Sequence, residues 1–169
     1  MAEDFEIRNK VAESGLVNFD LEDLVPKGKR MGIDLKDFLF EGQILKEKDF
    51  REKVALLDPE VYRGSFVYIY NSADAIVPLW AYFLIAAKIT DITPKIVFGS
   101  QEDLEVLLMH QAIQRHDFTE MRGKRVLVKG CSDGKIPENA YIELVEQLKP
   151  LVKSLMFGEA CSNVPIFKN

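Results

Sequence analysis

Short apolar runs alternate with amphipathic stretches from residue 63 onward. The runs are four to six residues long and rich in β-forming residues, which predicts strands at 65–70, 95–98, 125–129 and 154–157. Apolar residues recur at helical spacing between them, which predicts helices at about 75–88, from 100 onward and from 137 onward. This order favours parallel strands joined by right-handed helical crossovers. We therefore predict an α/β fold: a three-layer α/β/α arrangement with a mainly parallel sheet of at least four strands.

The first 62 residues have a different texture, with many charges and turn residues. Residues 31–35 alternate between apolar and polar side chains, which predicts a short strand. Residues 46–57 have amphipathic periodicity, which predicts a helix. A chain of 169 residues is about one domain long. We expect a single domain, 1–169, in which an N-terminal extension (1–62) packs on a βαβαβαβ core (63–169).

Similar turns follow the predicted strands. Asn71-Ser72-Ala73-Asp74 follows the first strand and Cys131-Ser132-Asp133-Gly134 follows the third, and each leads to Pro-x-x-Ala-Tyr. Ligands of parallel sheets bind at the carboxyl ends of the strands. This pattern predicts a site on that rim, formed by Asn71, Ser72, Asp74, Ser100, Cys131, Ser132, Glu159, Cys161 and Ser162. The alternative is purely structural, because Ser, Asn and Pro are ordinary residues of turns and helix starts.

The chain has two cysteines, Cys131 and Cys161, and each is followed by a serine. Neighbouring strands lie about 4.8 Å apart, so the two thiols could meet if their strands are neighbours. Two adjacent thiols can form a redox pair, hold a soft metal ion or an iron–sulfur cluster, or supply one nucleophile. Asp74 and Glu159 are candidate acid/base groups or oxygen ligands. The alternative for each cysteine is a small buried hydrophobic residue.

Composition and missing motifs narrow the function classes. A net charge of -5 disfavours a general nucleic-acid binder. The longest nearly unbroken apolar stretch, 76–87, is too short to cross a bilayer, and the first residues contain no apolar run. We therefore expect a soluble cytoplasmic protein that engages no membrane. The sequence contains no dinucleotide-binding glycine fingerprint, P-loop, His-Glu-x-x-His or Gly-x-Ser-x-Gly motif.

Several segments carry a family resemblance over nearly the whole chain. They are Gly15-Leu16 with Phe19-Asp20-Leu21-Glu22-Asp23, then 44–51, 72–82, 97–99, 129–132 and 158–165. Together they resemble the domain-of-unknown-function 2480 family. The resemblance implies a bacterial protein of the Bacteroidetes type. It also implies that family members have a cysteine where this chain has Asn71, so that this chain lacks one of three Cys-Ser turns and does not offer a three-thiol site. It also implies iron–sulfur assembly proteins as partners and, separately, a sugar-phosphate isomerase role.

Three hypotheses follow, and the sequence leaves open whether the protein is an enzyme. The first is an accessory factor that handles a thiol-ligated metal or iron–sulfur intermediate, with Cys131 and Cys161 as ligands. The second is an enzyme for a small metabolite, such as a sugar phosphate, with Asp74 or Glu159 as the base. The third is a non-catalytic binding or scaffolding module, in which Trp80 serves core packing or a homodimer contact.

Overall fold

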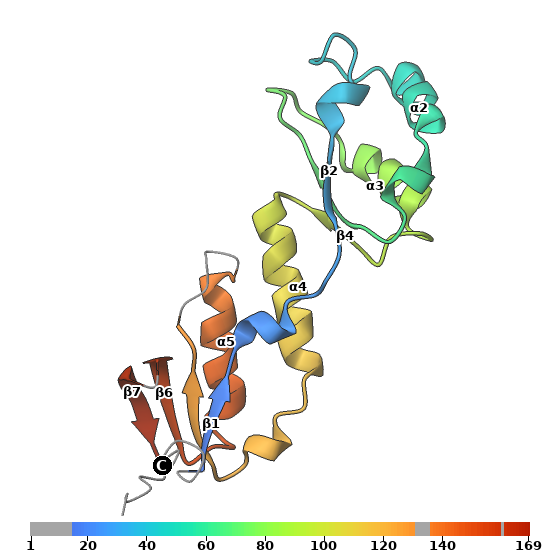
Figure 1. The fold of residues 1–169 in the computed structure, drawn as a ribbon. Helices are drawn as coiled ribbons and strands as arrows, with labels where there is room; N and C mark the ends of the chain where they lie inside the picture. Colours follow the sequence, from blue (N-terminus) through green and yellow to red (C-terminus); the bar gives the residue numbers. More distant parts are fainter. Residues whose placement is uncertain (1–14, 131–135, 160) are drawn as a thin grey trace, which may run out of the picture. The chain divides into compact units, whose positions relative to one another are not determined.

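The computed structural model describes residues 15–130, 136–159 and 161–169. The chain forms two compact units (Figure 1). Unit 2 is Pro26–Leu108, and unit 1 comprises the described residues up to Val25 together with those from Met109 onward. The boundary at residue 108 falls inside one helix, α4 (Gln101–Arg115).

Unit 2 is built on a parallel three-stranded sheet, called sheet B, with the strand order β2-β3-β4. Residues of β2, β3, α2 and α3 share one apolar core, in which Phe50 and Ile85 are fully buried. The elements of unit 2 are β2 (Arg30–Asp34), η2 (Leu35–Phe38), α2 (Glu47–Leu56), η3 (Pro59–Tyr62), β3 (Phe66–Tyr70), α3 (Leu79–Ile89), β4 (Lys95–Phe98) and the first part of α4.

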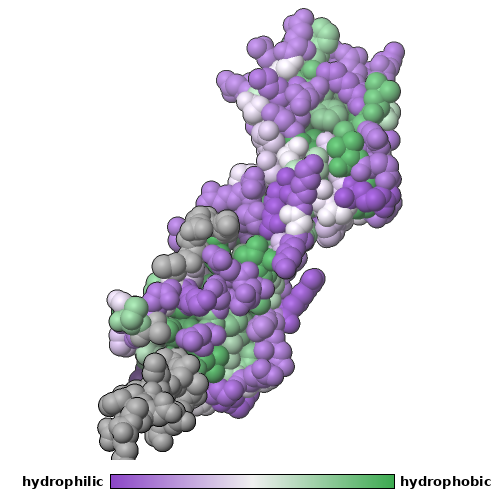
Figure 2. Space-filling model, in the orientation of Figure 1, coloured by the Kyte–Doolittle hydropathy of each residue, from purple (hydrophilic) through white to green (hydrophobic). Residues whose placement is uncertain are grey.

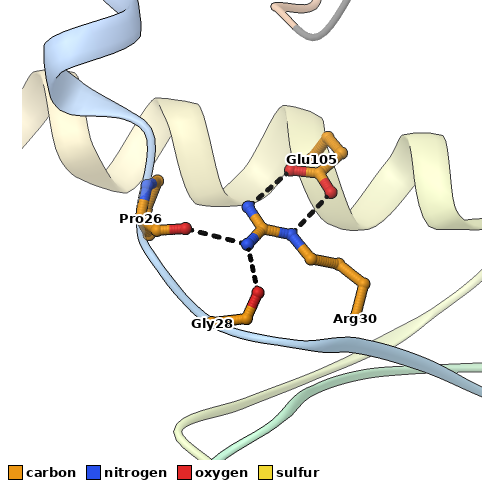
Figure 3. Close-up of polar contacts among 4 residues, drawn as sticks. All are labelled: Pro26, Gly28, Arg30 and Glu105. Carbon is orange, nitrogen blue, oxygen red and sulfur yellow. Dashed lines mark hydrogen bonds and ion pairs between the residues drawn. The ribbon is translucent and has the colours of Figure 1, made fainter.

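Arg30 ties the first part of α4 to the start of β2, both within unit 2 (Figure 3). Its guanidinium donates to both carboxylate oxygens of Glu105, over 2.8 and 3.0 Å. The same group donates to the carbonyl oxygens of Pro26 and Gly28, over 2.8 and 2.7 Å. The planar guanidinium has several N–H donors in fixed directions, so it can bind a carboxylate on one side and carbonyl oxygens on another. A lysine ammonium lacks this fixed geometry. The contact is therefore a structural anchor of unit 2.

Unit 1 is built on a four-stranded sheet, called sheet A, with the strand order β1-β5-β6-β7. Its first three strands are parallel, and β7 pairs antiparallel with β6. Pro165 lies in β7, beside a register irregularity, as expected of an edge strand that tolerates a missing N–H. The elements of unit 1 are β1 (Leu16–Phe19), η1 (Leu21–Leu24), the end of α4, η4 (Thr119–Met121), β5 (Arg125–Val128), α5 (Glu138–Leu148), β6 (Ser154–Glu159) and β7 (Ser162–Lys168).

The two units repeat one another at a constant offset of 59 residues, which relates β3 to β5, α3 to α5 and β4 to β6. Gly64 and Gly123 are also separated by 59 residues, and their φ angles are 69° and 70°. Their N–H groups donate to the carbonyls of Ile92 and Leu151, which have the same separation. The order β2-β3-β4 thus matches β1-β5-β6, and β7 is an addition in unit 1.

The structure confirms the α/β class and the parallel strands that the sequence predicts, and every predicted helix and strand is present. The helix predicted from about residue 75 begins later, at Leu79, because Pro78 precedes its first turn. The four core strands are, however, divided over two sheets instead of one. Leu16–Phe19 and Arg30–Asp34, from the expected N-terminal extension, each add a strand to a sheet. The three-layer arrangement and the single domain stay predictions.

The surface carries scattered apolar side chains. Figure 2 shows hydrophobic patches interspersed among hydrophilic residues on the face drawn. Leu56, at the end of α2, is 85% exposed. Within the described ranges, no helix combines the length and apolar character that a membrane crossing requires.

Candidate functional site

Asp34 joins the carboxyl ends of β2 and β3. It caps η2 by accepting from the backbone N–H of Lys36 over 3.0 Å. It also accepts from both the backbone N–H and the hydroxyl of Ser72, in the turn after β3. Burial raises the pKa of Asp34, but the bonds from Ser72 and Lys36 outweigh it, so the pKa lies below its usual value. An ionised carboxylate therefore stands at this edge of sheet B.

Asp20 has the same place in unit 1 but a different partner. It caps η1 by accepting from the N–H of Glu22, and the Lys129 ammonium donates to it over 3.1 Å. The bond from Glu22, followed by Lys129, lowers the pKa of Asp20. Asp20 in turn raises the pKa of Lys129, and Glu159 adds to that effect. The carboxyl-end edge of sheet A is therefore a charged network.

Several polar turn residues of unit 2 are engaged in local hydrogen bonds. The Asn71 amide donates to the carbonyls of Ala73 and Ala75, over 3.2 and 3.1 Å. Ser100 and Asp103 cap the start of α4 reciprocally, as in a capping box with aspartate in the acidic position. Asp74 is exposed. For Asn71, Ser72 and Ser100 these bonds match the structural alternative, in which such residues shape turns and helix starts.

An aromatic pocket lies beside these turns in unit 2 and has a volume of about 610 Å³. Four rings line it in two pairs. Tyr68 and Tyr70 are stacked with centroids 5.6 Å apart, and Tyr82 and Phe98 meet edge to face at 4.8 Å. Sequence reasoning missed this pocket, although the alternating tyrosines of β3 and the repeated Ala-Tyr were visible signals. The lining residues are Tyr68, Tyr70, Asn71, Tyr82, Phe98, Gly99, Ser100 and Gln101.

The candidate thiol edge belongs to unit 1. Strands β5 and β6 are parallel neighbours in register, as the thiol hypothesis requires. Cys161 is a free, exposed cysteine at the turn between β6 and β7, where Glu159 pairs with Ser162. It therefore belongs to a hairpin and does not precede a helix. Cys131 and Ser132 lie outside the described residues.

The predicted rim residues thus follow strands of two different sheets. Sheet B carries Asn71, Ser72, Asp74 and Ser100, and sheet A carries Glu159, Cys161 and Ser162. Sheet geometry alone does not unite them in one site. Within the part of the chain that the structure describes, no three His, Cys, Asp or Glu side chains are grouped as a metal site requires.

Replacing Asp34 by asparagine should lower the free energy of unfolding by about 1 kcal/mol at neutral pH, because one acceptor for Ser72 is lost. The pKa of Asp34 is lower in the folded protein than in the unfolded chain, where it is about 3.9. The stabilisation by the ionised carboxylate is therefore complete above about pH 3.9 and is lost as the pH falls through the folded-state pKa. Urea unfolding from pH 7 to 3 should therefore show a constant difference between the two proteins above about pH 4 and a difference that shrinks below it. The matched change Asp74→Asn, in the turn that contains Ser72, should cost less than about 0.5 kcal/mol throughout. A difference between Asp34→Asn and wild type that does not shrink as the pH falls below about 3.9 would contradict this assignment.

Fold and site together define an α/β protein made of two repeated parallel-sheet units, with an aromatic pocket on one and a free thiol on the other. The family model described as "Protein of unknown function (DUF2480)" matches residues 5–169, and the chain belongs to this family. Among curated proteins, none matches the chain. The solved structures likewise contain no match.

Proposed function

We propose that this protein is an accessory factor that holds a thiol-ligated metal ion or iron–sulfur intermediate at the carboxyl-end edge of sheet A. The observation that carries the proposal is the parallel, in-register pairing of β5 with β6. The segments that contain Cys131 and Cys161 follow these neighbouring strands in the sequence. Thiolate ligands favour soft ions such as Zn²⁺, Cu⁺ and the iron of clusters.

Glu159 supplies a third donor to this proposal. It ends β6 and pairs with Ser162, which directly follows the exposed Cys161. Two thiolates and one carboxylate leave a coordination position open on a tetrahedral ion. An open position suits a protein that passes its metal to a partner, and iron–sulfur assembly proteins are the partners we propose. Asp74 follows a strand of sheet B, so the pairing of β5 with β6 gives it no such support.

Purified anaerobically and reconstituted with Zn²⁺, or with ferrous iron and sulfide, the protein should retain about one metal ion or cluster per chain. Elemental analysis after gel filtration measures the retained metal, and absorption spectra identify a cluster. Cys131→Ala and Cys161→Ala should each abolish retention, and Glu159→Gln should weaken it. Asp74→Asn should leave it unchanged, which separates the two candidate oxygen ligands. Wild-type protein that holds no more metal than the double cysteine variant would end the proposal.

A second candidate is an enzyme for a small phosphorylated metabolite. It is supported by α3 and α5, which begin after Pro78 and Pro137 with no side-chain cap bond. First-turn N–H groups without a cap are potential anion donors. This candidate does not need the thiols, so sugar-phosphate binding by the double cysteine variant distinguishes it from the first proposal.

A further inference from the structure

The aromatic pocket of unit 2 has no role in the thiol proposal, yet its lining is chemically distinctive. Three tyrosines and one phenylalanine offer π faces and edges around a volume of about 610 Å³, which is in the usual range of ligand pockets. The face of an aromatic ring is negative, so it attracts cations as well as apolar groups. The rings alone are therefore compatible with a neutral or a cationic ligand.

The charges around the pocket favour a cationic ligand over a neutral one. None of the eight described lining residues is Lys, Arg or His. Asp34 is the register partner of Tyr70 and is bonded to Ser72, next to the lining residue Asn71. The pKa values of Tyr70 and Tyr82 are both raised. Burial is the largest cause, and the negative charge of Asp34 is the second. The pocket therefore lies in the field of a carboxylate.

The nearest basic residue along the chain does not reverse this field. Lys36 gives its backbone N–H to Asp34. Its side chain extends beside Gly42, where a Cβ would lie 3.5 Å from the Lys36 Cε. The Lys36 ammonium still acts on Asp34 and helps to lower the pKa of that carboxyl, but Lys36 itself does not line the pocket.

The start of α4 does not provide an anion site at this pocket. Ser100 lines the pocket, but its backbone N–H already donates to Asp103 over 2.7 Å. The Asp103 carboxylate also places a negative charge in the first turn, which offsets the positive end of the helix dipole. A phosphate here would meet this carboxylate and an occupied donor.

Comparison with unit 1 shows that the repeated fold does not by itself require the aromatic, uncharged lining of this pocket. Its Tyr141 and Phe157 reproduce the edge-to-face pair at the offset of 59 residues, with centroids 5.6 Å apart. At the same offset, however, Tyr68 and Tyr70 are replaced by Leu127 and Lys129. A stacked aromatic pair in one unit therefore corresponds to an ammonium group in the other.

We propose that the aromatic pocket of unit 2 binds an organic cation, specifically a methylated ammonium group. The four rings contact the methyl groups and the delocalised charge, and Asp34 supplies the long-range attraction. This site is independent of the thiols of unit 1.

The test titrates the full-length protein with choline and with its uncharged carbon isostere, dimethylbutanol, at one ionic strength. Tyrosine ring signals in NMR spectra report binding. Choline should bind at least about tenfold more tightly than the isostere, because only the charged ligand gains the cation–π attraction. Asp34→Asn should weaken choline severalfold and leave the isostere unchanged.

Matched variants tie any binding to the pocket. Tyr82→Leu should abolish choline binding, and Tyr82→Phe, which keeps the ring, should retain it. Tyr141→Leu makes the same change at the repeat-related position of unit 1 and should bind choline like wild type. Trp80 fluorescence checks that the variants of unit 2 are folded, and far-UV circular dichroism during urea unfolding checks Tyr141→Leu in unit 1. Equal affinity for choline and the isostere, a preference for inorganic phosphate, or loss of binding in Tyr141→Leu but not in Tyr82→Leu would overturn the proposal.

Discussion

Replacing Phe50 by alanine should lower the free energy of unfolding of unit 2 by about 3–5 kcal/mol, the largest effect expected of a single core truncation. Phe50 lies on α2 and is fully buried. Its ring packs against Phe38 at a centroid distance of 5.8 Å and against Trp80 of α3 at 5.6 Å. Alanine would remove both contacts and leave a cavity between two helices and a 3₁₀ turn. The core of unit 2 cannot close over it without moving α2.

The measurement uses a feature of the chain itself. Trp80 is the only tryptophan, and it belongs to unit 2. Its fluorescence during urea unfolding therefore reports the unit that is changed. Leu56→Ala, on the same helix at an 85% exposed position, is the control and should cost less than about 0.5 kcal/mol. A loss below about 1 kcal/mol in Phe50→Ala would show that Phe50 is not the centre of this core.

Local structure was predictable because it depends on local pattern. The run around β3 and the periodicity of α3 and α5 identify these elements without knowledge of their partners. β7 was missed because Pro165 resembles the prolines that open helices. In an edge strand a proline removes no hydrogen bond between strands. A proline in the sequence is therefore compatible with a helix start or an edge strand, and only the strand pairing distinguishes the two.

The division into two sheets was not predictable from the same signals. Apolar runs show that a strand exists, but they do not show which strand lies beside it. The repeat was the available clue, and the part recognised in the sequence was the turn with serine and aspartate that leads to Pro-x-x-Ala-Tyr. It also includes Arg63-Gly64 and Arg122-Gly123, where both glycines have positive φ. A repeat that extends through whole strands indicates two similar units more strongly than one rim.

The same limit applies to the candidate site. Cys161 and Glu159 were predicted from their place after a strand, and the structure puts both at the β6–β7 hairpin. Asn71, Ser72 and Ser100 were predicted for the same reason, but their side chains bond to neighbouring turns and a helix start. Position at a strand end is visible in a sequence. The hydrogen-bond partner that occupies the side chain is not.

Replacing Gly158 by alanine should cost about 3 kcal/mol and should disturb the hairpin that carries Cys161. Gly158 lies in β6 with φ of 126°, a conformation that side chains with a Cβ rarely adopt. An added Cβ would lie 2.6 Å from the carbonyl oxygen of Ser162. That oxygen belongs to the backbone of the paired strand, so relief requires the hairpin to separate.

Gly123→Ala is the matched control for the backbone conformation without the clash. Gly123 is also in unit 1, with φ of 70°, and a Cβ there would meet no atom within 4 Å. It should cost only about 1–2 kcal/mol. Urea unfolding followed by far-UV circular dichroism measures both losses, and hydrogen exchange of the β6 and β7 amides locates the first. Equal costs for the two variants would contradict the clash.

The same pair of variants links the hairpin to the proposed metal site. Gly158→Ala keeps both cysteines and Glu159, so any loss of metal retention would come from their arrangement and not from missing ligands. We expect Gly158→Ala to retain less metal than Gly123→Ala, because Glu159 and Ser162 can no longer pair across the turn. If the two variants retain equal metal while only Gly158→Ala loses hydrogen-exchange protection at the hairpin, the ligands do not depend on this turn. The proposed site would then have to be assigned to other residues of the protein.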